Sequence, residues 1–152
     1  MRAHLLDKLR ARTVAIQTRW ETLLHIEPVS GPLGNPDAMA RLIPETLREI
    51  LAAISATPRQ VTLQQAAANR LPACECGHNP YLSYFVAGEQ ALVEAFVLLQ
   101  SEMPASERHE SDLAELIQVI RHLGHGEIDT FCGICAHRCV DPKCRHRALA
   151  TA

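Results

Sequence analysis

The six cysteines carry the clearest chemical signal in this 152-residue sequence. Four of them form two close pairs, Cys74 with Cys76 and Cys132 with Cys135, which lie far apart along the chain. Thiolates in such pairs are common ligands of tetrahedral zinc, with Zn–S distances of about 2.3 Å. We therefore predict a structural zinc site whose four ligands are Cys74, Cys76, Cys132 and Cys135.

Other chemistry remains open for the same four cysteines. They could hold an iron–sulfur cluster or act as redox-active thiols, and they could also be small buried side chains with no ligand. A zinc-dependent enzyme would use three of them and keep water in the fourth position. Disulfides are disfavoured, because no secretory signal is present and a Cys74–Cys76 bridge would close a very small, strained ring.

The C-terminal segment contains a second group of residues that could bind a metal. These residues are His137, Cys139, Cys144 and His146. They could form a second metal site or replace a ligand of the first, or Cys139 and Cys144 could close reversibly into a disulfide. Alternatively, the segment is a solvated tail, since its basic residues have no interleaved aromatic residues. For that reason we expect no nucleic-acid partner.

Glu89 occupies a position of helical periodicity where an apolar residue is expected. A carboxylate there requires either a raised pKa or a cationic partner. It could line a ligand pocket together with Tyr84. The alternative is a carboxylate at the rim of the core that pairs with an arginine such as Arg41 or Arg48.

Apolar residues recur at helical intervals along nearly the whole chain, which predicts an all-α bundle of about four main helices. Asn35-Pro36 and Asn79-Pro80 are typical helix starts, with asparagine as the cap and proline at the first helical position. Pro44 should kink or split the helix that contains it. Ser106 is the expected cap of the last helix.

The last two long helices should form an antiparallel hairpin around Pro104. At 1.5 Å per residue, Pro80 lies roughly 36 Å from this turn and Cys132 roughly 42 Å. Both cysteine pairs should therefore meet at one end of the hairpin. We expect a single helical domain over residues 1–136, followed by a basic tail over residues 137–152.

Composition limits the class of protein. With 47% hydrophobic and 21% charged residues, the sequence is typical of a soluble globular domain and not of a disordered chain. A net charge of −2 excludes a strongly basic nucleic-acid binder. No uninterrupted apolar run approaches the roughly 18 residues that cross a membrane, so we expect no membrane partner. There is no apolar leader, and the expected location is the cytoplasm.

The sequence also lacks the common catalytic signatures, including the zinc-protease, phosphate-loop and dinucleotide-binding motifs. It favours a regulatory or protein-interaction module over an enzyme. The sequence does not identify the protein partner, and it leaves open a homodimer.

Overall fold

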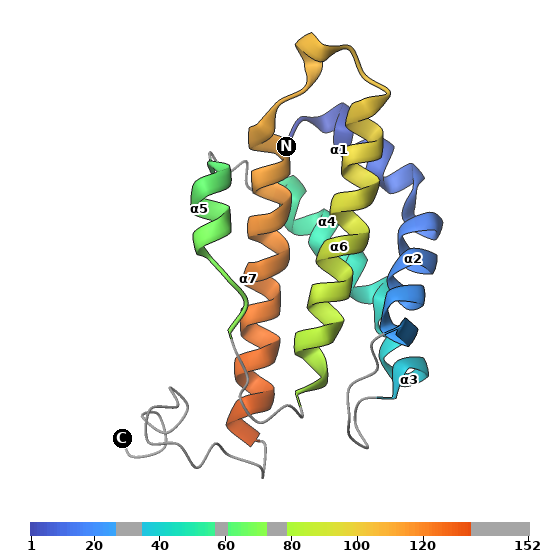
Figure 1. Cartoon of the computed structure of the whole chain (residues 1–152), viewed down its shortest axis with the longest axis vertical. Coiled ribbons are helices and arrows are strands. Elements are labelled where there is room, and N and C mark those ends of the chain that lie inside the picture. The colour runs from blue at the N-terminus through green and yellow to red at the C-terminus, as the bar shows by residue number, and fades with distance from the viewer. Residues whose placement is uncertain (27–34, 57–60, 73–78, 135–152) are drawn as a thin grey trace.

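The computed structural model describes residues 1–26, 35–56, 61–72 and 79–134, and every regular element in these ranges is a helix (Figure 1). A 3-10 helix, Ala105–Glu107, precedes the last α-helix. The α-helices are α1 (Ala3–Ala11), α2 (Thr13–Ile26), α3 (Pro36–Ala40), α4 (Ile43–Ala56), α5 (Leu63–Ala68), α6 (Pro80–Ser101) and α7 (Glu110–Ile134). The all-α prediction is confirmed. The expected number of main helices is not, because the described ranges contain seven α-helices.

Two breaks in the chain account for most of the difference. The first expected helix is divided into α1 and α2 at Arg12, whose φ of −100° and ψ of 9° are not those of a regular helix. The second is divided into α3 and α4 just before Pro44, which lies in the first turn of α4. Proline has no amide hydrogen to donate, so it is tolerated there but not in the interior. The predicted split at Pro44 is confirmed.

The asparagine caps are present where the sequence predicts them. Asn35 Oδ1 accepts a hydrogen bond from the Asp37 amide, and Asn79 Oδ1 accepts one from the Tyr81 amide, both at 3.0 Å. The prediction that Ser106 caps the last helix is wrong. Ser106 lies within the 3-10 helix, and α7 begins only at Glu110.

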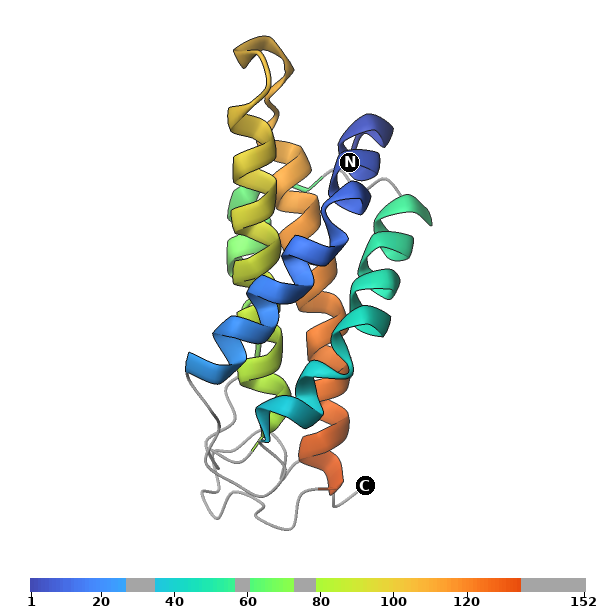
Figure 2. The same ribbon diagram turned by 90° about the vertical axis from the view of Figure 1, so that its right-hand side faces the viewer.

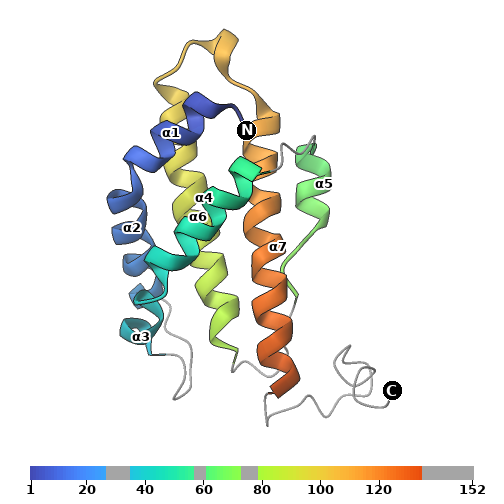
Figure 3. The same ribbon diagram turned by 180° about the vertical axis from the view of Figure 1, so that it is seen from behind.

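The antiparallel pair of α6 and α7 forms the centre of the bundle (Figure 1). On one side α5 packs against α7, and on the other α2 crosses α6 at an oblique angle (Figure 2). Seen from behind, α4 runs across the pair (Figure 3). One continuous apolar core joins α1, α2, α4, α6 and α7, and its largest fully buried side chains include Trp20, Tyr84, Phe85 and Phe96.

The packing of α2 against α6 depends on a glycine. A Cβ atom on Gly88 would lie 2.2 Å from Trp20 Cζ2, far inside van der Waals contact. Trp20 is fully buried, and its Nε1 donates to the Tyr84 carbonyl oxygen at 2.9 Å. The indole ring also stacks at a tilt on the Tyr84 ring, with centroids 4.8 Å apart. Gly88 is therefore the residue that lets α6 accommodate the indole.

We predict that Gly88→Ala lowers the free energy of unfolding by about 1–3 kcal/mol, because the indole must move away from its hydrogen bond. Urea denaturation measures this. The matched control is Gly126→Ala in α7, where an added Cβ meets no atom within 4 Å. That substitution should raise stability by about 0.5–1 kcal/mol through helix propensity alone. Equal effects of the two substitutions would contradict the packing described here.

Candidate functional site

The beginning of α6 is attached to the end of α7 by one side chain. Asn79 is buried, and its Nδ2 donates to the Ile128 carbonyl oxygen and to Cys132 Sγ, each at 3.2 Å. Its Oδ1 caps α6 through the Tyr81 amide. The two helices therefore meet at the end of the hairpin where the sequence predicts that the cysteine pairs converge.

Cys132 is the only predicted metal ligand within the described ranges. It is buried in the last turns of α7, where its sulfur accepts the hydrogen bond from Asn79. Its neighbour Phe131 contacts Tyr81 edge to face, with ring centroids 6.1 Å apart, and thereby adds an apolar contact at the same helix ends. Hydrogen bonds and ring contacts thus both fix the position of Cys132 relative to the start of α6.

The other predicted ligands lie outside the described residues. These are Cys74, Cys76 and Cys135 of the first site and His137, Cys139, Cys144 and His146 of the tail. Within residues 1–26, 35–56, 61–72 and 79–134, no group of three or more histidine, cysteine, aspartate or glutamate side chains is placed to hold a metal ion.

Glu89 has a cationic partner, although not one of those suggested by the sequence. Arg121 of α7 donates from Nη2 to Glu89 Oε1 at 2.6 Å and from Nε to Glu89 Oε2 at 2.7 Å. The two side chains are 17% and 19% exposed. Arg121 Nη1 also donates to the Ala66 carbonyl oxygen at 2.8 Å, which ties α5 to this pair. The hydrogen bond to Glu89 is the main cause of a raised Arg121 pKa.

Tyr84 lies in the core. Its hydroxyl donates to Thr46 Oγ1 at 2.9 Å, and its ring meets Phe85 edge to face. Burial raises its pKa well above the ordinary tyrosine value. Glu89, by contrast, lines a surface hollow of about 360 Å³ between α6, α7 and the residues Arg70 and Leu71 that follow α5. Tyr84 is not among the described residues that line this hollow, so the structure does not bring the two together there.

A larger hollow, of about 530 Å³, lies between α2 and α6. Several of its polar side chains already bond to one another or to neighbours. Arg19 Nε donates to Glu94 Oε2 at 2.7 Å, and Gln90 Nε2 donates to Glu94 Oε1 at 2.9 Å. The Arg19 hydrogen bond is the main reason why the Glu94 pKa falls to about 2. Most of the remaining lining is apolar, from residues such as Leu23 and Leu82.

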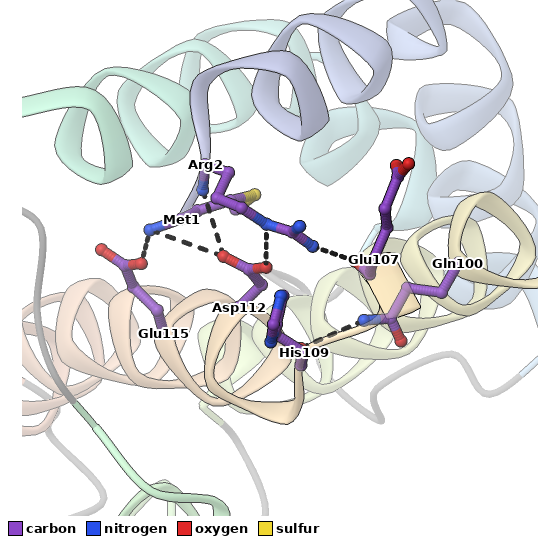
Figure 4. A network of polar contacts seen from close by, with 7 residues as sticks. All are labelled: Met1, Arg2, Gln100, Glu107, His109, Asp112 and Glu115. Carbon is purple, nitrogen blue, oxygen red and sulfur yellow. Dashed lines mark hydrogen bonds and ion pairs between the residues drawn. The ribbon is translucent and has the colours of Figure 1, made fainter. Parts of the chain in front are cut away.

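A second polar cluster, which the sequence analysis missed, lies at the opposite end of α7 (Figure 4). Asp112 and Glu115 are buried there. Asp112 accepts from the Arg2 amide and from Arg2 Nε, both at 3.1 Å, and the Met1 amino group pairs with Glu115. Burial is the main cause of the lowered pKa of that amino group. These carboxylates join the two residues before α1 to the start of α7, which gives the cluster a structural role.

Comparison of the chain with protein-family models, with curated proteins and with solved structures gives no match.

We predict that Arg121→Met lowers the free energy of unfolding by roughly 1–3 kcal/mol, because it leaves a half-buried carboxylate and a carbonyl oxygen without their donor. Arg48→Met is the matched control, since Arg48 pairs with Glu45 on the exposed surface of α4. That change should stay within about 0.5 kcal/mol. Chemical denaturation of both variants measures the difference, and similar values for the two would contradict a stabilising role for the Glu89–Arg121 pair.

The Arg19–Glu94 pair predicts a pH dependence of stability. The folded protein lowers the Glu94 pKa from 4.5 to about 2, so the pair stabilises the fold above pH 4.5. This contribution is lost as the pH falls from 4.5 towards 2. The stability difference between wild type and Glu94→Gln should therefore be largest near neutral pH and shrink in acid. Denaturation curves across this range measure it, and a difference that grows in acid would refute the assignment.

Proposed function

We propose that this chain is a metal-binding helical protein in which Cys74, Cys76, Cys132 and Cys135 hold one structural zinc ion. The zinc fastens the segment before α6 to the end of α7. In this account the protein is a regulatory or protein-interaction module, and the metal maintains its shape without taking part in a reaction.

The observation that carries the proposal is the hydrogen bond from Asn79 Nδ2 to Cys132 Sγ. Asn79 follows Cys76 by three residues, so covalent geometry keeps their Cα atoms within about 11 Å of each other. Cys135 follows Cys132 by the same number of residues. Both cysteine pairs therefore lie within a few residues of the contact between Asn79 and Cys132. Thiolates gathered within such reach suit tetrahedral zinc.

The hydrogen bond from Asn79 to Cys132 suits a sulfur atom that serves as a metal ligand. Sulfur ligands of metals commonly accept hydrogen bonds from groups around the site, which orient the ligand and offset its charge. The Asn79 side chain makes two further hydrogen bonds, one to the Ile128 carbonyl oxygen and one from the Tyr81 amide. These hold its nitrogen in place, so it is a rigid donor of this kind. Asn79 would therefore orient the Cys132 sulfur as well as cap α6.

A binding role, in preference to catalysis, is supported by the polar groups of the two surface hollows. Glu89 and Arg121 bond to each other, as do Arg19 and Glu94. These side chains stabilise the helix packing and are engaged before any ligand arrives. Each hollow also has apolar lining residues, such as Leu23 and Leu82 in the larger one and Leu71 and Val93 in the smaller one, and these are suited to contact with another protein.

The test is metal analysis and a visible spectrum on protein purified without oxygen. We predict one zinc per chain and no colour in the wild type. Cys132→Ser should lose most of the zinc and lower Tm by roughly 10 °C, which corresponds to a few kcal/mol. A chelator should lower Tm of the wild type and leave that of the variant unchanged.

Cys139→Ser is the matched control, because Cys139 is not one of the four proposed ligands. This variant should keep its zinc and its Tm. Loss of zinc from Cys139→Ser alone would contradict the ligand assignment. Iron with visible charge-transfer absorption would replace the proposal by an iron–sulfur protein, and oxidant-driven release of metal would indicate a redox sensor using the same cysteines.

A further inference from the structure

Both ring nitrogens of His25, in the last turn of α2, contact oxygen atoms that accept hydrogen bonds and cannot donate them. Nδ1 lies 2.8 Å from the Glu21 carbonyl oxygen, one turn earlier in the same helix. Nε2 lies 3.1 Å from Asp37 Oδ1, in the first turn of α3. A neutral imidazole has one N–H group, whereas the imidazolium has two. Only the protonated ring can therefore donate both hydrogen bonds at once.

A neutral His25 ring loses one of these two contacts. If its proton stays on Nδ1, the lone pair of Nε2 faces the Asp37 carboxylate, which is also an acceptor. If the proton moves to Nε2, the lone pair of Nδ1 faces the Glu21 carbonyl oxygen instead. In either case the charge attraction between His25 and Asp37 disappears.

The charges around His25 favour the protonated ring. Among the charged side chains of the described residues, Glu21 and Asp37 are those that act on it, and both are acidic. The hydrogen bond to the Glu21 carbonyl oxygen is the main cause of a raised His25 pKa, and the hydrogen bond to Asp37 adds to it. The helix dipoles act in the same direction, because a cation is favourable at the end of α2 and an anion at the start of α3.

The short helix α3 depends on its contacts with the rest of the bundle. It has five residues, whereas an isolated helix in water needs roughly 12–15. It lies beside the end of α2 (Figure 1), where the buried side chain of Met39 and the His25–Asp37 pair attach it. Asn35 fixes the position of Asp37 by accepting a hydrogen bond from its amide at 3.0 Å. Loss of the pair should therefore loosen α3 as a unit.

We propose that His25 is a pH-dependent clasp, which holds α3 against α2 when its ring is protonated and releases α3 when the ring is neutral. In the released state Met39 leaves the core, so the apolar surface beside α2 changes with pH. None of these residues is a proposed metal ligand, and the clasp is therefore independent of the zinc site.

The direction of the effect follows from the two states of the ring. Folding raises the His25 pKa above its ordinary value of 6.5. The stabilisation of α3 is therefore complete below pH 6.5 and is lost as the pH rises through the raised pKa of His25.

Amide hydrogen exchange on the purified chain, followed by NMR at about pH 6 and about pH 8, tests the proposal on either side of the ordinary histidine pKa. The reporter is the Met39 amide, which donates to the Asn35 carbonyl oxygen at 3.1 Å. Its protection, corrected for the intrinsic pH dependence of exchange, should fall roughly two- to fivefold at the higher pH. A change of this size corresponds to an exposed ion pair.

Two variants should abolish this pH dependence. In His25→Gln the Met39 protection should no longer change with pH. Asp37→Ala should have the same effect and should also lower the His25 pKa, as measured from the ring proton signals. Glu45→Ala is the matched control, because Glu45 is an acidic residue in the first turn of α4 that pairs with Arg48 of its own helix. That variant should behave as the wild type does.

Several results would overturn the proposal. One is a Met39 protection that does not change with pH in the wild type, and another is a pH dependence that persists in His25→Gln. A His25 pKa that Asp37→Ala leaves unchanged would show that the pair does not form. Equal effects of Asp37→Ala and Glu45→Ala would also contradict the clasp, because they would assign the change to surface charge in general.

Discussion

The side-chain amide of Asn79 fixes how the two longest helices lie against each other. Both hydrogen bonds donated by its nitrogen go to α7, to the Ile128 carbonyl oxygen and to Cys132 Sγ, while its oxygen caps α6. A buried amide is stable only when its donors and acceptors are satisfied, because each unsatisfied group costs about 1–3 kcal/mol. Asn79 meets this requirement in one register of α6 against α7. The position of Cys132 beside the start of α6 follows from that register.

The rest of the bundle is arranged around α6. One face of α6 packs on α7, and another accommodates Trp20 of α2 at Gly88. The Glu89–Arg121 pair adds a polar link from α6 to α7, and Arg121 extends it to the carbonyl oxygen of Ala66 in α5. What remains is an outer face of valines between two hollows. The metal proposal concerns the start of this helix, where its cap Asn79 contacts α7.

Much of the fold could be predicted from the sequence, because helical periodicity and capping are local properties. The Asn35-Pro36 and Asn79-Pro80 starts are present, and so is the break before Pro44. The break between α1 and α2 at Arg12 was not predicted, since no proline or glycine marks it. Ser106 failed as a cap because the chain forms a 3-10 turn before α7.

Contacts between distant residues were harder to predict. The sequence indicated that Glu89 needs a cation, but the choice of Arg121 over Arg41 or Arg48 depends on the rotation of α7 about its axis. Likewise, the acidic residues Asp112 and Glu115 look like ordinary surface residues at a helix start, and only their contacts with the first two residues of the chain explain their burial. For the cysteines, the sequence supplied the spacing, and the described structure adds the place of Cys132 alone.

X-ray absorption at the zinc edge of the wild-type protein tests the central claim most directly, because it reports the atoms bound to the metal. The account predicts a single shell of four sulfur atoms at about 2.3 Å. A shell that contains nitrogen or oxygen ligands at about 2.0–2.1 Å, or protein purified without oxygen that contains no zinc, would contradict it.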